Sequence, residues 1–251
     1  MGAVAALALL GGLIAGSFVT VVAHRVPRGE SIVAPRSRCP SCGVQVAAYD
    51  NVPVLSWLIL GGRGRCCGKP ISGRYPSAEV GLGLLYGASV LVLWGKPTAI
   101  ALGLVFVTLL VAVTLTDLER RIIPNRILLV AAGAGLIITA VGDPGSLPER
   151  ALAAAAAGGL LFVVALAYPG GMGLGDVKLA AVMGLFLGRS VAPAILVALL
   201  AGSLVGLVMI ARDGAGARKR AIPFGPFLAL GGVVGLLFGA QMISWYLGTF
   251  S

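Results

Sequence analysis

Long apolar stretches, separated by short clusters of glycine, proline and charged residues, cover most of the 251-residue chain. Each of eight such stretches approaches the roughly 20 residues that a helix needs to cross the hydrocarbon core of a bilayer. Their approximate bounds are residues 2–23, 78–95, 98–116, 126–141, 150–168, 176–189, 190–211 and 223–248. The first stretch has no basic segment before it and no small-residue cleavage site after it, so we expect a retained span. The pattern predicts an all-α polytopic membrane protein with about eight transmembrane helices.

Composition supports the membrane assignment. Apolar residues make up 58% of the chain and charged residues only 11%, whereas soluble domains carry charge on about a quarter of their residues. A soluble fold of this size has too much surface to cover with so few charges. The 38 glycines fit the close packing of helices in membranes, where small residues let backbones approach.

The basic residues predict the orientation. Between the first two spans lies a polar segment, residues 24–77, which holds eight lysines and arginines. Connections on its side of the membrane hold 16 of the 19 basic residues, and the opposite side holds only Lys96, Arg150 and Arg189. Because cytoplasmic loops are rich in lysine and arginine, we expect the N-terminus outside and residues 24–77 in the cytoplasm. The net charge of +10 is then mainly a topology signal, so the expected partner is the lipid bilayer, and no nucleic acid.

Two aspartates fall at the cytoplasmic ends of predicted spans. Asp117 closes the third span, which runs inward, and Asp176 opens the sixth, which runs outward. Topology alone therefore brings both carboxylates to the same membrane depth. A carboxylate in a span costs roughly 2.5–3.5 kcal/mol on insertion scales and usually has a function. The alternative is a pair of solvated interfacial acids neutralised by Arg120, Arg121 or Lys178.

The sequence before Asp176 is unusually rich in glycine. Residues 170–175 read Gly-Gly-Met-Gly-Leu-Gly, which permits positive φ angles and the close approach of another backbone. An extended peptide could lie against such a loop. A phosphate-binding loop is the competing interpretation, but it would need a following Lys-Ser/Thr pair, and here an acid follows.

Paired aspartates suit peptide hydrolysis. Two nearby carboxylates share a proton, so that the ionised one activates water while the protonated one polarises the scissile carbonyl. His24 is the only histidine and no serine or cysteine motif surrounds it, which argues against the other protease mechanisms. A transporter or channel that uses the acidic pair is the alternative, although no acid continues a route across the membrane. A methyltransferase or assembly factor without protease activity is a further one.

A series of motifs then follows in a recognisable order. They are Gly16-Ser17-Phe18, Arg25-Val26-Pro27, Cys39-Pro40-Ser41-Cys42, Tyr49-Asp50-Asn51-Val52-Pro53-Val54-Leu55-Ser56-Trp57, Pro70-Ile71-Ser72-Gly73-Arg74-Tyr75-Pro76, Asp117 with Ile123-Pro124-Asn125, Gly173-Leu174-Gly175-Asp176-Val177-Lys178-Leu179, and Pro223-Phe224-Gly225-Pro226-Phe227. Over nearly its whole length the chain resembles the bacterial type IV prepilin peptidases, membrane aspartic proteases with a Gly-x-Gly-Asp signature.

This resemblance implies an activity and a site. The chain would cleave the leader from prepilins or pseudopilins at the cytoplasmic face of the bacterial inner membrane, with Asp117 and Asp176 catalytic and no cofactor needed for proteolysis. The implied substrate-binding loop residues are Gly173, Gly175, Lys178, Pro223, Gly225 and Pro226. Many members also methylate the new N-terminus with S-adenosylmethionine, an activity associated with the N-terminal cytoplasmic region. The expected domains are a first transmembrane helix (1–23), a cysteine-containing segment (24–77) and a protease domain of about seven helices (78–251). Glu79 matches an acidic family position, although it also suits an ordinary helix N-terminus.

All four cysteines lie in residues 24–77, where a reducing compartment disfavours disulfides and favours metal binding. Cys39-Pro-Ser-Cys42 has the spacing of a zinc knuckle. The family pattern supplies a second Cys-x-x-Cys that ends at Cys67, but its first position holds Gly64. We expect structural zinc on Cys39, Cys42 and Cys67, with Cys66 as the fourth ligand despite the turn that two adjacent ligands require. The alternative is a reduced loop without metal.

Overall fold

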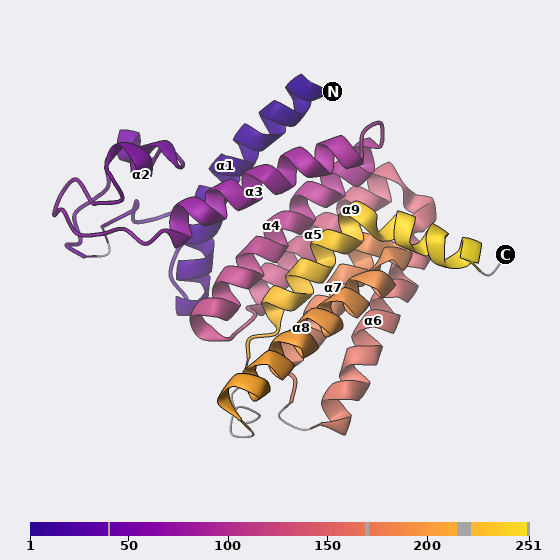
Figure 1. The fold of residues 1–251 in the computed structure, drawn as a ribbon. Helices are drawn as coiled ribbons and strands as arrows, with labels where there is room; N and C mark the ends of the chain where they lie inside the picture. The colour runs from indigo at the N-terminus through magenta and orange to yellow at the C-terminus, as the bar shows by residue number, and fades with distance from the viewer. Residues whose placement is uncertain (40, 169–170, 215–221, 250–251) are drawn as a thin grey trace. The chain divides into compact units, whose positions relative to one another are not determined.

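The computed structural model describes residues 1–39, 41–168, 171–214 and 222–249, and within them the only β-structure is two isolated bridges. The helices, labelled in Figure 1, are α1 (Gly2–Arg25), α2 (Leu55–Ile59), α3 (Arg74–Val92), α4 (Pro97–Arg120), α5 (Asn125–Gly142), α6 (Leu147–Ala167), α7 (Leu174–Leu187), α8 (Val191–Asp213) and α9 (Gly225–Thr249). Short 3₁₀ helices cover Val26–Arg28, Ala48–Asn51, Pro144–Ser146 and Gly188–Ser190. The prediction of an all-α polytopic membrane protein is confirmed.

The eight predicted spans coincide with α1 and with α3 to α9, with their ends displaced by a few residues. By length and composition, six segments of the described residues qualify as membrane spans. One of them, Leu174–Asp213, contains both α7 and α8, which are separated by the short helix Gly188–Ser190. Helix α3, which begins with Arg74, is not among the six.

The chain divides into two compact units, residues 1–95 and 96–251. In the first unit α1 packs along α3, and a Gly12-xxx-Gly16 motif forms the contact. A Cβ atom at Gly12 would lie 2.7 Å from Cα of Gly83, and one at Gly16 would lie 2.6 Å from Cα of Glu79. The two backbones therefore touch, as small-residue motifs allow in membrane helices. This contact fixes the position of Glu79 on α3.

Between α1 and α3 the chain forms two tight turns. Antiparallel bridges join Arg38 to Gln45 and Arg63 to Pro70, and each turn carries two of the four cysteines. Helix α2 lies between the turns in sequence. These bridges pair too few residues to make a sheet, so other interactions must hold the segment together.

The second unit is the helical bundle α4 to α9 (Figure 1). Helix α6 packs on α7, α8 on α9, and α4 on both α5 and α9. Its core is apolar, and the rings of Phe106 and Phe186 stack with centroids 5.2 Å apart. The largest fully buried side chains of this core are Phe106, Leu110, Leu161, Leu179, Met183 and Leu228. This packing brings the end of α4 next to the beginnings of α7 and α9.

Candidate active site and cysteine cluster

Asp117 lies inside the last turns of α4, which continues to Arg120. Its side chain is buried, and its Oδ2 atom accepts a hydrogen bond of 2.8 Å from the backbone N–H of Gly225. Gly225 is the first residue of α9, where backbone N–H groups have no partner within the helix. Hydrogen bonds to a carboxylate are stronger than those between neutral groups. The beginning of α9 thus holds the Asp117 carboxyl in place.

Only glycine fits at position 225 beside this carboxyl. A Cβ atom there would lie 2.8 Å from Oδ2 of Asp117 and 3.2 Å from its Cβ and Cγ atoms. Pro223 and Pro226 lie on either side of Gly225 in sequence, and proline has no backbone N–H to donate. As the second residue of α9, Pro226 occupies a position where the missing N–H costs nothing.

Asp176 lies in the first turn of α7, three residues after the N-cap residue Gly173. Its Oδ2 atom accepts a 3.3 Å hydrogen bond from the N–H of Gly173, which closes the N-terminal turn as a capping-box acid does. The side chain is half-buried. Of the glycine-rich loop predicted before it, residues 171–175 are described, and Gly170 lies outside the described residues.

The carboxyls of Asp117 and Asp176 lie near enough for their charges to interact. The segment between α4 and α5 completes this end of the bundle, because Ile123 contacts Gly175 so closely that a Cβ atom there would lie 3.1 Å from Cβ of Ile123. Lys178 binds another residue and not the two aspartates, since its Nζ atom donates to Oδ1 of Asn125 at 3.1 Å. Within the described part of the chain, neither aspartate forms an ion pair with lysine or arginine. Both carboxyls are instead bound by backbone N–H groups of glycine.

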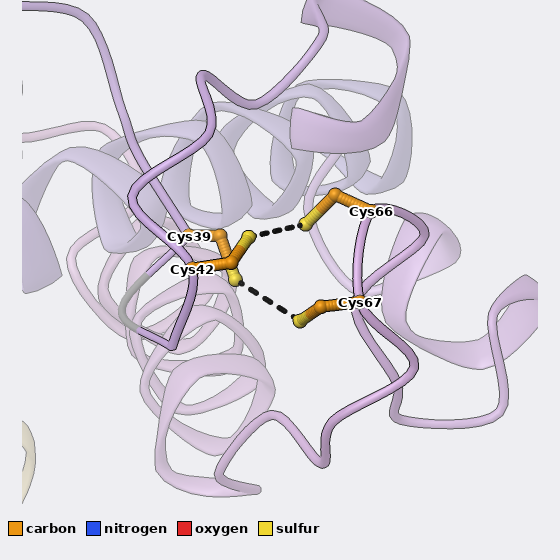
Figure 2. Close-up of side chains that lie close together, drawn as sticks. All are labelled: Cys39, Cys42, Cys66 and Cys67. Carbon is orange, nitrogen blue, oxygen red and sulfur yellow. Dashed lines mark hydrogen bonds between the residues drawn. The ribbon is translucent and has the colours of Figure 1, made fainter.

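The four cysteine sulfur atoms form a second cluster, in the first unit. Figure 2 shows Cys39 and Cys42 on one loop and Cys66 and Cys67 on the facing loop, with their side chains turned toward one another. Sulfur atoms of Cys39 and Cys67 are 3.7 Å apart, those of Cys42 and Cys66 are 3.1 Å apart, and all four lie within 4.8 Å of one another. All four thiols are free. A tetrahedral zinc ion with Zn–S bonds of about 2.3 Å separates its sulfur ligands by about 3.8 Å, so this donor set fits such an ion.

The two cysteine turns share one backbone pattern. The carbonyl of Cys39 accepts from the N–H of Gly43 at 2.9 Å, and the carbonyl of Gly64 accepts from the N–H of Gly68 at 2.7 Å. Gly64 therefore occupies the place in its turn that Cys39 occupies in the other. A Cβ atom at Gly64 would lie 3.7 Å from the sulfur atoms of Cys39 and Cys67, so this position faces the cluster although it has no thiol.

Cys66 supplies the fourth sulfur in place of residue 64. The sequence suggested that two adjacent ligands would strain the turn, yet among described non-glycine residues only Val54 and Arg121 have positive φ. Gly68 takes the left-handed conformation instead, with a φ of 66°, which glycine adopts without steric cost. The turn thus accommodates the adjacent pair of Cys66 and Cys67.

The thiols differ in acidity. Backbone N–H groups of Ser41 and Cys42 lower the pKa of Cys39 to about 6. Neighbouring thiols, first Cys42 and then Cys39, raise the pKa of Cys66 to about 12. Metal ions bind the thiolate form, which the lowered pKa of Cys39 favours.

Comparison with known proteins agrees with this geometry. Residues 10–93 match the bacterial peptidase A24 N-terminal domain, and residues 104–211 match the type IV leader peptidase family. Proteins called prepilin leader peptidase/N-methyltransferase are 35% identical in Aeromonas hydrophila (97% of this chain, 94% of that protein) and 37% identical in Bacillus subtilis strain 168 (94% and 95%). One from Burkholderia pseudomallei strain K96243 is 35% identical (93% and 85%). No solved structure matches the chain.

The chain therefore belongs to the type IV leader peptidase family, as its motifs predicted. The prediction of a protease is confirmed at the level of this family, and the transporter or channel alternative is not favoured. Its apolar helices and its family fit a multi-pass protein of the bacterial inner membrane.

Ile123 and Asn125 belong to a sequence motif that predicts no individual role for either residue. The structure gives them one each: Ile123 packs on Gly175, and Asn125 binds Lys178. Their position directly after the helix that carries Asp117 was the available signal, but nothing in the sequence says which distant residues they contact.

Proposed function

We propose that this chain cleaves the leader from type IV prepilins or pseudopilins, with Asp117 and Asp176 as the catalytic carboxyls. The observation that carries this proposal is the pairing of two carboxyls from α4 and α7, each bound by a glycine N–H at one end of the bundle. The name prepilin leader peptidase/N-methyltransferase, borne by relatives that cover most of the chain, supports the choice of substrate.

The chemistry needs only these two groups and water. The ionised carboxyl removes a proton from water, which attacks the scissile carbonyl, while the protonated carboxyl donates to the carbonyl oxygen. The tetrahedral intermediate collapses as its nitrogen gains a proton and the C–N bond breaks. No covalent enzyme intermediate forms. Gly225 and Gly173 keep the carboxyls oriented during the cycle, because each donates a backbone hydrogen bond to one of them.

The glycine-rich loop is the proposed binding surface for the substrate backbone. Gly171, Gly173 and Leu174 are exposed, and Gly173 directly contacts the Asp176 carboxyl. A peptide lying on this loop would place its scissile bond beside the aspartates. Gly175 holds the loop against the segment between α4 and α5 through Ile123. Lys178 supports it through Asn125, while Gly225, with Pro223 and Pro226 on either side in sequence, binds the carboxyl of Asp117.

The proposed orientation has the N-terminus outside and the aspartates at the cytoplasmic face. It rests on the excess of lysine and arginine in residues 24–77 and in the loops after the third, fifth and seventh predicted spans. Arg218, Lys219 and Arg220 of the last loop lie outside the described residues. Prepilin leaders are removed at this face, so the orientation and the proposed activity agree.

The second proposed activity is methylation of the new N-terminus. It is supported by the printed name of the relatives and by the match of residues 10–93 to the N-terminal domain of this peptidase group. S-adenosylmethionine would supply the methyl group when bound. Proteolysis needs no cofactor in this scheme.

Mass spectrometry of a processed substrate tests both activities. Purified full-length protein in detergent or liposomes is incubated with a synthetic prepilin, and the product is expected to begin at the residue after the leader. Added S-adenosylmethionine is expected to make that product heavier by one methyl group. Intact prepilin after long incubation would contradict the peptidase proposal, and a trimmed but unmethylated product would contradict only the methylation.

The proposed metal of the cysteine cluster is zinc. A segment with only two isolated bridges has little regular structure of its own, and a tetrahedral ion would tie its two turns together. We expect about one zinc per chain by elemental analysis. Cys66→Ser should weaken zinc binding by more than about 100-fold, measured by competition with a chelator.

Two further variants make this zinc test specific. Adding Gly64→Cys to Cys66→Ser should restore binding, because a Cβ atom at position 64 already lies 3.7 Å from two of the sulfur atoms. Ser41→Ala, on the same turn as Cys42, is the control and should leave zinc bound. A wild-type protein without zinc, or Cys66→Ser with full affinity, would refute the four-cysteine site.

A further inference from the structure

The short helix α2 (Leu55–Ile59) presents an apolar face that the rest of the first unit leaves uncovered. Leu55, Leu58 and Ile59 are 57%, 59% and 78% exposed, and their spacing places them on one side of the helix. Single exposed apolar side chains are ordinary on a protein surface, whereas a group of large ones marks an interaction site. With five residues, α2 is far too short to cross a bilayer.

The other side of α2 is bound to the first unit through polar groups. Ser56 is buried, and its hydroxyl donates to the carbonyl of Tyr49 at 3.0 Å and accepts from the N–H of Val52 at 3.1 Å. The half-buried Trp57 donates its indole N–H to the carbonyl of Ile71 at 3.2 Å. A surface helix of a soluble domain turns its apolar face inward, so α2 has the reverse arrangement.

A strained turn sets the direction in which α2 begins. Val54 has φ 61° and ψ −50°, and the N–H of Leu55 donates to the carbonyl of Pro53 at 2.6 Å. This is a γ-turn with positive φ at its centre, which is rare and unfavourable for a β-branched residue. Such strain persists where the surroundings enforce it. Here the N–H of Val54 donates to Oε2 of the buried Glu79 at 2.7 Å, which ties the turn to α3.

This hydrogen bond also sets the level of α2 along the membrane helices. Glu79 lies about 7.5 Å along α3 from its first residue, Arg74. A Cβ atom at Gly16 of α1 would lie 2.6 Å from Cα of Glu79, and Gly16 is about 13 Å along the axis from the end of α1 at Arg25. Helix α1 belongs to the candidate membrane span Gly2–Arg28. Helix α2 therefore begins within a side chain's length of the apolar part of a span, and not beyond its polar end.

The apolar outer surface of α1 reaches the same level. Leu7, Leu10, Ile14 and Phe18 are each more than half exposed, and their spacing of three or four residues aligns them on one side of the helix. On a membrane span such a stripe faces lipid. Because Phe18 lies about half a turn beyond Gly16, the lipid-facing surface extends to the level at which α2 is attached.

Basic side chains follow α2 in the sequence. Arg63, Lys69 and Arg74 are exposed, and Arg74 is the first residue of α3. The anionic headgroups of a bilayer attract such residues near its surface. An exposed apolar face with lysine and arginine nearby is the combination by which a helix binds in the plane of a membrane interface.

We propose that α2 lies in the interface of the bilayer that the chain spans, with Leu55, Leu58 and Ile59 among the acyl chains. Arg63, Lys69 and Arg74 then contact anionic headgroups of the same leaflet. The proposal requires neither the peptidase nor the methylation proposed above. Since one cysteine turn precedes α2 and the other follows it, this third attachment keeps both turns close to the membrane surface.

Spin labelling of the full-length protein in liposomes tests the position of α2. The liposomes contain phosphatidylethanolamine and phosphatidylglycerol. A keto amino acid replaces Ile59 and is coupled to a nitroxide, so that the four cysteines stay unmodified. Collisions of the nitroxide with oxygen, which concentrates in the bilayer, and with chromium oxalate, which stays in water, give its depth. We expect the label about 5–10 Å into the boundary between headgroups and acyl chains.

Two exposed apolar positions of the same unit calibrate this measurement. Val44, in the first cysteine turn, should carry its label in water, and Leu84, on α3, should carry it within the acyl chains. A label at Leu55 should move toward water when Leu58→Ser and Ile59→Ser are combined, and Val44→Ser should leave it in place. All these side chains are exposed, so the fold should tolerate the changes, which thermal unfolding checks.

Two results would overturn the proposal. A label at Ile59 that collides mainly with chromium oxalate would place α2 in water. A label shielded from both reagents would show that protein covers the apolar face, and broadening by a second nitroxide would identify that protein as another copy of the chain. No prepilin is present in the liposomes, so collision with oxygen at the expected depth reports contact with lipid alone.

Discussion

Asp117→Asn and Asp176→Asn are each expected to lower prepilin cleavage by about 10²–10⁴-fold, the usual contribution of a positioned acid or base. An asparagine at position 117 can still accept the N–H of Gly225, so the geometry survives, but the amide can neither take a proton from water nor share one. The measurement is kcat/KM for a synthetic prepilin with purified protein. The double variant should be little worse than either single one, because the two groups act as a unit.

Asp143→Asn is the matched control for these variants. Asp143 is the exposed residue that directly follows α5, and it takes no part in the contacts around Asp117 and Asp176. It should retain wild-type kcat/KM. Near-normal cleavage by either active-site variant, in protein shown to be folded by its thermal unfolding, would refute the two-aspartate mechanism.

Gly225→Ala is expected to cost about 10–100-fold in kcat, since a misplacement of about 1 Å at a catalytic group can cost 100-fold. The added Cβ atom would lie 2.8 Å from Oδ2 of Asp117, so either the carboxyl or the beginning of α9 must move. The carboxyl also loses alignment with the N–H that binds it. Steady-state kinetics on the same peptide should show kcat falling more than KM rises.

Gly133→Ala provides the control for a methyl group added to a membrane helix. Gly133 lies in α5, where an added Cβ atom meets nothing within 4 Å. Its kcat should stay at the wild-type value. Equal losses in Gly133→Ala and Gly225→Ala would show that the effect comes from the helices in general and not from the Asp117 contact.

The helices were predictable because apolar length is a strong signal in a membrane chain. The sequence placed eight spans where α1 and α3 to α9 lie. Helix ends were less well predicted, as α4 runs beyond Asp117 to Arg120 and α3 begins at Arg74. The apolar pattern cannot locate the end of a helix that extends into polar residues, because backbone hydrogen bonds alone are enough to extend it.

The candidate site was partly predictable. Because successive spans alternate in direction, the sequence predicts that Asp117 and Asp176 lie at the same membrane depth. This prediction requires no knowledge of side-chain contacts. The bond from Gly225 to Asp117 joins residues 108 positions apart, so only the packed bundle reveals it. Likewise the sequence is compatible with two roles for Glu79, a family acidic position and an ordinary helix N-terminal acid. Only the packed structure shows that Glu79 is buried, beside the turn in which Val54 has a positive φ.

The two positions 64 and 66 offer alternative places for the fourth thiol of the proposed metal site. A Cβ atom at position 64 would lie within 4 Å of the sulfur atoms of Cys39, Cys66 and Cys67, so a chain with cysteine at both positions would have five thiols around one site. A ligand could therefore move from one position to the other through two single substitutions, with four thiolates available at every stage. Such a path would let the turn change its fourth ligand while the proposed metal site keeps four thiols throughout.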